Sequence, residues 1–543
     1  MIVPSKFNWL LTLVKSELSP SAYESFELSC PNQLTSAWEH ACSVLNISMA
    51  ELAKKISLTF SIDLATLPTH KLDISGFHDS ILEKYNVIVV AEDDRNILFA
   101  TANPFDQEMS SMLHFLTDKN VRFAISTPPD ITQWISKNIT HDKATKIHYK
   151  ASPGVDSSAT VRLVRKVLEK AILDRASDIH IEPSNEGGVV RFRIDGLLQK
   201  ILTLPLPVFK QVGQRVKAVS NMDVSKNLIA QDGQVHLTTE QGALDLRVSS
   251  IPVRGGEKFV IRLLKNDTIK SLNEQHFLEP EVKLLKELMT RQNGIVVMSG
   301  PTGSGKTTTL NSAIQEVNSI DKCIITIEDP VEYEIEGVAQ INVNPTQGLT
   351  FQVALSHVLR QDPDVILVGE VRDSETARTA IRSALTGHLV LTTLHTNDAI
   401  TVISRLKDLG ISDPLLADSL KGLAAQRLVR KLCPSCSVKI QSAESKLEHE
   451  FVRVHNHLPS MRAQGCGACN NSGYKGRIPL LEILVVDEDF ADAIRTNATT
   501  KQLTSLAQKQ GMRKLADVAT EHILNGNTTV EEAFRVLGKE LLI

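Results

Sequence analysis

The sequence predicts a multidomain α/β protein whose largest domain contains a doubly wound, mostly parallel sheet. Three observations predict this fold class. The apolar strand GIVVMS runs straight into a glycine-rich loop and a helix-forming stretch. Further buried strands then alternate with helices, as in parallel α/β domains. Finally, 543 residues with 42% hydrophobic content are enough for three or four domains with separate cores.

Residues 1–138 are expected to form helices followed by a small α/β unit. LTSAWEHACSVL and MAELAKKISLTF read as helices, whereas YNVIVVAEDD, NILFATANP and VRFAIS read as strands around a helix. The polar stretch 139–157 has no periodicity and is predicted to be a linker.

An apolar stripe at helical spacing lies close to the N-terminus. Its residues are Phe7, Leu10, Leu11 and Val14. Such a stripe can dock on a membrane-platform partner, but a helix that packs on its own domain is the simpler interpretation.

Residues 158–266 are predicted to form a mixed α/β second domain that begins with a helix. The helical stripe consists of Val161, Val164, Leu168 and Ile172. In the strand VVRFRIDG the apolar residues face one way, and Arg191 and Arg193 share the other face. These arginines could hold a phosphate, form a salt bridge between subunits, or lie on a solvated face.

The third domain, residues 267–543, contains a phosphate-binding loop. The segment 300–307 fits GxxxxGK[ST] between a buried strand and a helix-forming stretch. Glycines let backbone N–H groups approach the phosphates, Lys306 reaches the β and γ phosphates, and the Thr307 hydroxyl ligates Mg²⁺. The residues expected at the nucleotide are Gly300, Pro301, Thr302, Gly303, Ser304, Gly305, Lys306, Thr307 and Thr308.

Acidic residues and histidines follow the other buried strands. The strand 365–368 ends in Gly369 and Glu370, and a carboxylate there is placed to coordinate Mg²⁺ or to activate water. An earlier strand, CIITIEDPVEYE, ends in Glu328, Asp329 and Glu332. His388 precedes and His395 follows the strand LVLTTL, which is expected to neighbour the strand of the P-loop, so a functional role is predicted for both.

Four cysteines form two CxxC pairs within residues 430–475. Cys433, Cys436, Cys466 and Cys469 supply the thiolates of a tetrahedral structural Zn²⁺ site, with free buried thiols as the alternative. The 29 residues between the pairs are expected to contain structure of their own. Cys30, Cys42 and Cys323 are scattered and read as packed residues. Residues 485–543 are expected to be helical.

Charge and hydropathy exclude several classes of protein. The net charge of −4 argues against a bulk nucleic-acid binder. No run of 18 or more apolar residues occurs, and the N-terminus lacks the features of a signal peptide. The expectation is a cytoplasmic protein that does not bind nucleic acid.

Segments along residues 160–543 resemble the secretion-superfamily ATPases, specifically the motors of type II secretion and type IV pilus assembly. They are RASDIHIEP, VRFRIDG, IEDPVE, GLTF, LRQDPDVILVGEVRD, TGHLVLTTLHTNDA, AQRLVRKLCPSC and GYKGR. The N-terminal region resembles the family more loosely, through ATANPFDQEMSSMLHFLTDKNVRFAIS.

The resemblance implies a hexameric ring whose subunits pair a mixed, PAS-like domain with a RecA-like ATPase domain that uses ATP and Mg²⁺. The family's acidic box maps onto 328–332, which includes Asp329 and Glu332, and its histidine box maps onto 388–398. Glu370 would position or deprotonate the attacking water. Arginines would neutralise charge on the γ-phosphate. The matching arginines are Arg247, Arg262, Arg360, Arg372, Arg405 and Arg477.

The function implied is the assembly of pilin or pseudopilin fibres by ATP hydrolysis coupled to an inner-membrane platform protein. A cytoplasmic adaptor would hold the protein peripherally at the inner membrane. Gln234 and Ser356 depart from the family, which usually has arginine at both positions. The alternative is therefore a regulatory or scaffold subunit that binds nucleotide and hydrolyses it weakly. A nucleic-acid translocase is disfavoured by the charge and by the cysteine element.

Overall fold

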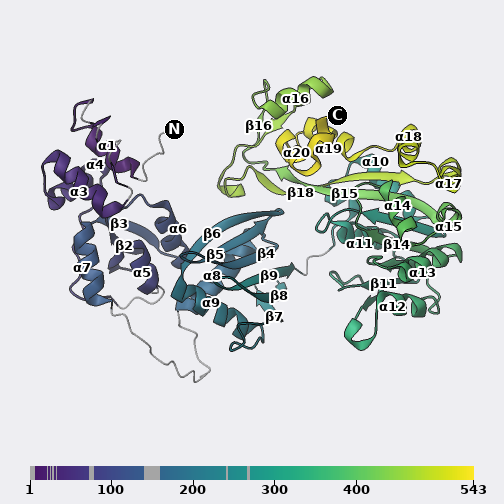
Figure 1. Ribbon diagram of the computed structural model, residues 1–543, viewed down its shortest axis with the longest axis horizontal. Coiled ribbons are helices and arrows are strands. Elements are labelled where there is room, and N and C mark those ends of the chain that lie inside the picture. The colour runs from purple at the N-terminus through teal and green to yellow at the C-terminus, as the bar shows by residue number, and fades with distance from the viewer. Residues whose placement is uncertain are drawn as a thin grey trace. The chain divides into compact units, whose positions relative to one another are not determined.

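The computed structural model describes residues 7–20, 23–24, 26, 30–31, 33–72, 77, 79–139, 159–239, 242–265 and 269–542. The chain divides into two compact units, Met1–Lys265 and Asn266–Ile543, which are described separately (Figure 1). The linker expected at 139–157 lies outside the described residues except for Ile139. The division of the first unit into domains at 138 and 158 stays a prediction.

The N-terminal part of the first unit combines helices with a small sheet. The helices predicted from LTSAWEHACSVL and MAELAKKISLTF are confirmed as α3 (Leu34–Leu45) and α4 (Met49–Phe60), and a capping box of Ser48 and Glu51 begins α4. The three predicted strands form a sheet in the order β1-β2-β3. The other elements are α1 (Asn8–Lys15), α5 (Asp79–Tyr85), β1 (Val87–Glu92), β2 (Asn96–Thr101), α6 (Gln107–Leu116), β3 (Asn120–Ile125) and α7 (Pro128–Asn138).

The apolar stripe near the N-terminus is buried inside this part of the chain. Leu10 and Val14 on α1 are fully buried, and they belong to one core with Trp38 and Ala41 of α3. The prediction that the stripe packs on its own domain is confirmed, and these side chains are not available to a membrane partner.

The remainder of the first unit is an antiparallel six-stranded sheet with two helices on one face. Its strand order is β6-β5-β4-β9-β8-β7. In β5 the alternation is confirmed, because Val190 and Phe192 are buried while Arg191 and Arg193 lie on the other face. The elements are α8 (Ala159–Leu173), β4 (Asp178–Ser184), β5 (Gly187–Ile194), β6 (Leu197–Pro205), α9 (Leu206–Val219), β7 (Gln231–Thr239), β8 (Gly242–Val253) and β9 (Gly256–Lys265).

The buried face of α8 differs slightly from the predicted stripe. Its deepest residues are Leu163, Val167 and Ala171. Val164, Leu168 and Ile172 are only partly buried, at the edge of the same core. The predicted stripe therefore flanks the core rather than pointing into its centre.

The second unit is built on a seven-stranded sheet in the order β12-β11-β13-β14-β10-β15-β18. All neighbours are parallel except β15 and β18. Its strands are β10 (Gly294–Ser299), β11 (Ile324–Glu328), β12 (Ala339–Asn342), β13 (Val365–Val368), β14 (Leu389–Leu394), β15 (Leu420–Leu432) and β18 (Tyr474–Val485).

Helices cover both faces of this sheet, so the predicted doubly wound α/β class is confirmed. Ile295 and Val297 of β10 face one core, and Val296 and Met298 face the other. The core with Ile295 packs against α12 (Phe351–Val358), α13 (Ser374–Leu385), α14 (Thr401–Asp408), α15 (Asp413–Ser419), α17 (Glu488–Arg495) and α18 (Thr500–Lys509). The opposite core packs against η1 (Leu272–Gln275), α10 (Glu279–Met289) and α11 (Lys306–Val317).

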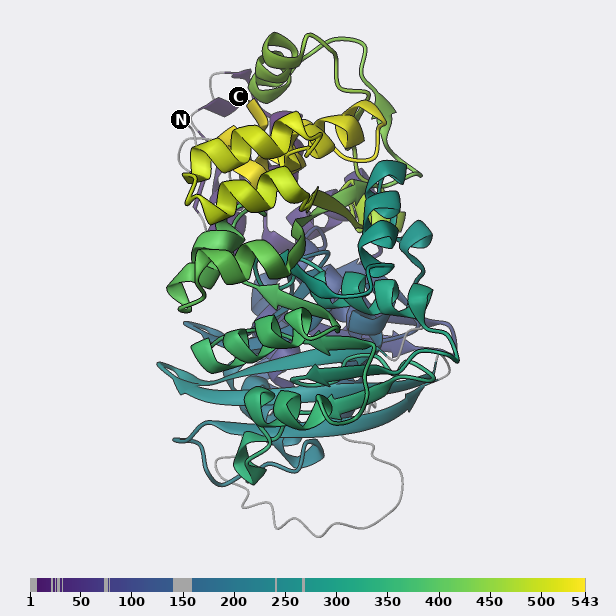
Figure 2. The ribbon, with the colours of Figure 1, turned by 90° about the vertical axis from the view of Figure 1, so that its right-hand side faces the viewer.

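The C-terminal helices form a further core beside the ends of β15 and β18. Figure 2 shows the yellow helices α19 (Leu515–Leu524) and α20 (Val530–Leu537) side by side. They share buried residues with α16 (Lys446–His455). The short elements are η2 (Pro345–Gln347), β16 (Val438–Lys439), β17 (Met461–Arg462), η3 (Gly467–Cys469) and η4 (Gly538–Leu542). Among the helices that the structure describes, none combines the length and hydrophobicity that crossing a bilayer requires.

Candidate nucleotide site and cysteine cluster

The order of the parallel strands gathers the predicted nucleotide residues at one edge of the sheet. β10 pairs with β14, β14 with β13, and β13 with β11. Because the carboxyl ends of parallel strands meet at the same edge, the residues that follow them lie close together. Those residues are Gly300 after β10, His395 after β14, Glu370 after β13 and Asp329 after β11.

Two glycines of the P-loop, Gly300 and Gly305, are required by what lies behind the loop. Gly300 and Gly305 have φ angles of 147° and 86°. A Cβ on Gly300 would lie 2.5 Å from the carbonyl oxygen of Gln426, and one on Gly305 would lie 2.8 Å from its Nε2. The Oγ of Ser304, in the same loop, is buried without a partner. The loop thus has the backbone freedom and the polar donors that phosphates need.

Lys306 lies at the first position of α11, next to the loop. It is 8% exposed, and its Nζ donates to the carbonyls of Gly300 at 2.8 Å and Pro301 at 3.1 Å. Burial lowers the pKa of Lys306 to about 8; Glu370 acts to raise it and Arg427 to lower it further. Thr307 and Thr308 follow it in the first turn of α11, where a Mg²⁺–phosphate group would be held.

Glu370 is held by an arginine and faces a histidine. Its carboxylate is paired with Arg372, and its Oε2 lies 3.6 Å from Nε2 of His395. The Nδ1 of His395 lies 3.2 Å from the carbonyl oxygen of Gly300. Since a carbonyl only accepts hydrogen bonds, this Nδ1 carries the proton. His395 therefore lies between the P-loop, which it contacts through Nδ1, and the carboxylate of Glu370.

The acids at the end of β11 and beyond it have two different environments. Glu328 is 2% exposed and accepts from Thr326 Oγ1 at 2.7 Å and from Gln340 Nε2 at 3.2 Å. Asp329 and Glu332 are exposed beyond the strand. The charge of Asp329 helps to raise the pKa of Arg372, after the larger effect of the hydrogen bond to Glu370. Asp329 thus lies near the Glu370–Arg372 pair.

His388 lies at the other edge of the sheet. It precedes β14, and its carbonyl accepts from the N–H of Gly294 at the start of β10. Its Nδ1 contacts the carbonyl of Ser383 at 2.9 Å. His388 and His395 flank the six residues of β14, so seven extended steps of about 3.3 Å place them about 23 Å apart. Within this subunit the structure does not bring His388 to the P-loop.

The predicted arginines are distributed over both units. Arg247 and Arg262 are cross-strand neighbours on β8 and β9, and Arg262 Nε lies 3.1 Å from Asp178 Oδ1. Gln234 lies opposite Arg247 on β7.

In the second unit, Arg372 contacts Glu370, as described above. Arg360 instead contacts its own helix, because its Nη1 donates to the carbonyl of Ser356 at 3.0 Å. Arg405 is in the last turn of α14, and Arg477 lies opposite Arg430 on the β15–β18 ladder.

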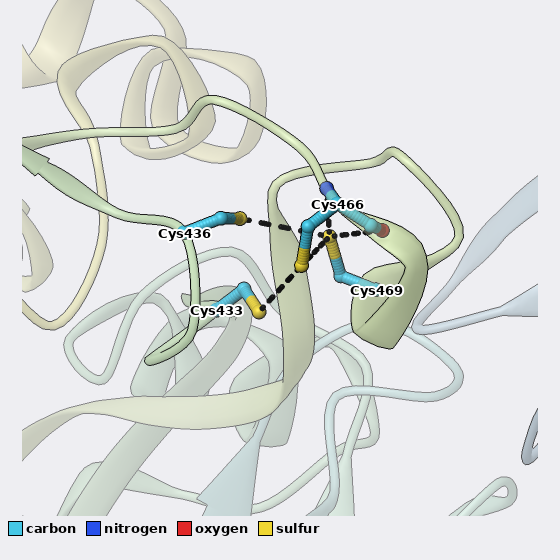
Figure 3. A group of neighbouring side chains, drawn as sticks. All are labelled: Cys433, Cys436, Cys466 and Cys469. Carbon is cyan, nitrogen blue, oxygen red and sulfur yellow. Dashed lines mark hydrogen bonds between the residues drawn. The ribbon is translucent and has the colours of Figure 1, made fainter.

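The four predicted cysteines form one cluster, drawn in Figure 3. Their sulfurs all lie within 4.8 Å of one another, with pairs at 3.8 to 4.0 Å. Four thiolates about 2.3 Å from a tetrahedral Zn²⁺ would be about 3.8 Å apart, so the cluster fits this ion. Backbone N–H groups of Gly465 and Gly473 donate to Cys436 and Cys469 at 3.3 Å.

The segment between the cysteine pairs contains structure, as predicted. β16 and β17 form a two-stranded antiparallel sheet, and α16 connects them. Arg462 of β17 is paired with Glu448 of α16, whose carboxylate is almost fully buried.

Three residues at the nucleotide edge were not predicted from the sequence. Gln426 and Arg427 lie on β15 and Glu482 lies on β18. Gln426 contacts the P-loop, and the other two contact the residues that follow His395. The available signal was a polar residue inside an apolar run, as in GLAAQRL and PLLEILV.

Comparison with known proteins gives consistent matches. Residues 154–535 match the family described as Type II/IV secretion system protein, and residues 56–144 match the MshEN domain. The chain is 41% identical to type II secretion system protein E of Pseudomonas aeruginosa, over 71% of this chain and 77% of that protein. It is 37% identical to the type IV pilus assembly ATPase PilB of Thermus thermophilus, over 83% of this chain and 52% of that protein.

The structure of the Legionella pneumophila ATPase DotB resembles this chain with a TM-score of 0.52 and 22% identity, over 70% of this chain and 96% of that one. This likeness supports the RecA-like fold alone. The family match covers well over half of the chain, and the matched range, residues 154–535, includes the P-loop, Glu370 and the four clustered cysteines. The chain belongs to the type II/IV secretion system protein family, whose members include the type II secretion protein E and type IV pilus assembly ATPases.

Proposed function

We propose that this protein is a hexameric Mg-ATPase that powers the assembly of pilin or pseudopilin fibres. Hydrolysis would be coupled to movement of an inner-membrane platform protein, and a cytoplasmic adaptor would keep the ATPase peripheral to the membrane. Relatives named as secretion and pilus assembly proteins support this proposal.

The observation that carries the proposal is the arrangement of Gly300, His395 and Glu370. The Nδ1 of His395 contacts the carbonyl of Gly300, and its Nε2 faces the carboxylate of Glu370, which follows β13, two strands away from β10. A carboxylate that is separated from a phosphate-binding loop by one side chain is placed to orient a water molecule in line with the γ-phosphate. His395 would keep that carboxylate in position while Lys306 neutralises phosphate charge.

Several further roles follow from the same proposal. Thr307 would ligate Mg²⁺, and Asp329 and Glu332 would act on the metal's water shell from the end of β11. Arg247 and Arg262 would neutralise charge on the γ-phosphate, and His388 would act only in an arrangement other than the one within this subunit. The four cysteines would hold Zn²⁺ as a structural ion, because no ligand position is left open for chemistry.

Steady-state ATP turnover of zinc-replete protein tests the proposal. The rate per subunit is measured together with the oligomeric state in the same sample, with Glu370→Gln as the inactive control. Turnover that rises as hexamers form, and that falls at least about 100-fold in the variant, supports the motor. A folded hexamer that binds ATP but turns over no faster than Glu370→Gln contradicts it.

A regulatory or scaffold subunit with weak hydrolysis is the second candidate. Two observations favour it: Gln234 and Ser356 replace expected arginines, and Arg372 neutralises Glu370 in this structure. The same assay separates the two candidates, because a regulatory subunit binds ATP and turns it over at the rate of the Glu370→Gln variant.

A further inference from the structure

Strand β15 presents two adjacent polar side chains to the nucleotide edge, one on each face of the sheet. Gln426 is 1% exposed; its Nε2 donates to the carbonyl of Ser304 at 2.8 Å, and its Oε1 accepts from Thr309 Oγ1 at 2.9 Å. The next residue, Arg427, points to the opposite face, as alternation along a strand requires. Gln426 therefore contacts the P-loop and α11, whereas Arg427 faces the loop that starts at His395.

Arg427 is fixed by two backbone carbonyls. Its Nη1 donates to Gln426 at 3.0 Å and its Nη2 to Asn397 at 2.8 Å. An added Cβ on Gly300 would lie 3.4 Å from this Nη1, so the guanidinium also lies beside the P-loop. One planar side chain thus spans from the P-loop to residues 395–400, which we call the His395 loop.

Glu482 holds the same loop from the neighbouring strand. Glu482 lies on β18, opposite Ala425 of β15, and it is 4% exposed. Its Oε1 accepts from the backbone N–H of Ala399 at 2.8 Å. Burial lowers the pKa of Arg427, and the charges of Glu540, Glu482 and Asp398 oppose this shift. Burial raises the pKa of Glu482 to about 7, whereas the hydrogen bond from the N–H of Ala399 lowers it, so the side chain offers an acceptor to Ala399 in either protonation state.

The His395 loop has one further attachment, to the end of the P-loop strand. Ser299 Oγ donates to the carbonyl of Asp398 at 3.3 Å. The loop is thus attached to β10, β15 and β18, while its first residue lies between Gly300 and Glu370. A shift of the loop moves His395 away from both groups.

We propose that Arg427 and Glu482 are positioning residues, which hold the His395 loop against the P-loop and so place His395 beside Glu370. This inference rests on the proposed ATPase function for its kinetic consequence, but not for its structural one. In this proposal neither side chain contacts the phosphates, so its removal slows hydrolysis and leaves nucleotide affinity nearly unchanged. Removal of Gln426 is expected to weaken nucleotide binding instead, since this side chain contacts the P-loop itself.

The kinetic test compares variants of the full-length, zinc-replete protein. Arg427→Gln and Glu482→Ala are expected to lower kcat about 10–100-fold, with Kd for ADP changed less than about twofold. Glu482→Gln keeps an acceptor for the N–H of Ala399 and is expected to retain kcat within about threefold. Gln426→Leu is expected to raise the Kd for ADP about tenfold. Arg453→Gln, at an exposed arginine paired with Glu450, is the matched control.

A second measurement, hydrogen exchange, does not depend on ATP turnover. Hydrogen exchange of the wild-type protein should show the amide of Ala399 protected, and Glu482→Ala should speed its exchange about tenfold while peptides of the P-loop stay unchanged. Rapid exchange of Ala399 in the wild type overturns the inference. The inference is also overturned if Arg427→Gln has the same kcat as Arg453→Gln. It is overturned as well if the activity lost in Arg427→Gln returns fully at saturating ATP, because the variant would then affect only nucleotide affinity.

The two proposals fail in distinguishable ways. If the wild-type protein does not hydrolyse ATP, the proposed function fails and the exchange measurement still decides whether the loop is held as described. If the wild type hydrolyses ATP but Arg427→Gln and Glu482→Ala do so equally well, only the positioning role fails.

Discussion

Raising the pH through 8 should weaken nucleotide binding, because Lys306 loses its proton in the free protein. Its pKa is about 8, lowered chiefly by burial and further by Arg427, while Glu370 opposes the shift. A bound phosphate stabilises the charged ammonium and raises this pKa again. Below pH 8 most free molecules already carry the charge on Lys306, whereas above pH 8 nucleotide binding must be accompanied by the uptake of a proton.

The size of the effect follows from simple titration. With a pKa of about 8, Lys306 is neutral in about 10% of free molecules at pH 7, about 50% at pH 8 and about 90% at pH 9. ADP binding should therefore take up about 0.1, 0.5 and 0.9 protons at these values. The apparent Kd should rise about eightfold between pH 7.5 and pH 9.

Isothermal titration calorimetry of ADP in buffers of different ionisation enthalpy counts these protons directly. Lys306→Arg is the matched control, because a guanidinium stays charged over this range and its proton uptake should remain near zero. The reasoning is refuted if the wild type takes up fewer than about 0.1 protons at pH 9, or if its Kd changes in parallel with that of Lys306→Arg.

Three further predictions concern stability and rate. The wild type should contain about one Zn²⁺ per chain by elemental analysis, and Cys469→Ser should lose it and melt at least about 5 °C lower, since metal binding contributes to folding; an unchanged melting temperature would contradict a structural ion. Burial raises the pKa of Glu281 to about 8, so the wild type should lose stability as pH rises from about 4.5 to 8, by up to roughly 5 kcal/mol. Glu281→Gln should remove this loss, as urea denaturation at pH 5.5 and 8.5 can show, and equal pH dependence in both proteins would disprove it. Ser356→Arg should raise kcat about tenfold or more if the missing cation limits turnover, and an unchanged kcat would remove Ser356 as an explanation for weak hydrolysis.

Much of the fold could be predicted because its signals are local. The helices α3 and α4 have the predicted bounds, since apolar spacing and polar caps lie within each segment. The P-loop and the CxxC pairs were also visible, because their chemistry requires fixed residue types at short spacing. Glu370 could be inferred because a carboxylate at the tip of a buried strand has few structural roles.

What could not be predicted depends on contacts between distant segments. His388 and His395 bracket one strand and looked equivalent, but the two ends of a parallel strand lie at opposite edges of the sheet. On α8, the residues beside the predicted stripe are apolar as well, and contact with the sheet buries Leu163, Val167 and Ala171 most deeply. The roles of Arg427 and Glu482 required the register of β15 against β10 and β18, which no local pattern encodes.

The strand order explains why this nucleotide site needs supports outside the recognisable motifs. Because β14 lies between β10 and β13, the P-loop and Glu370 are not on neighbouring strands, and His395 fills the interval. To act on Glu370, His395 must be positioned to within about 0.5 Å, yet it begins a loop rather than a helix or a strand. The side chains that fix such a loop must come from the next strands outward, which are β15 and β18. The same two strands border the cysteine cluster, because β15 ends just before Cys433 and β18 begins just after Cys469.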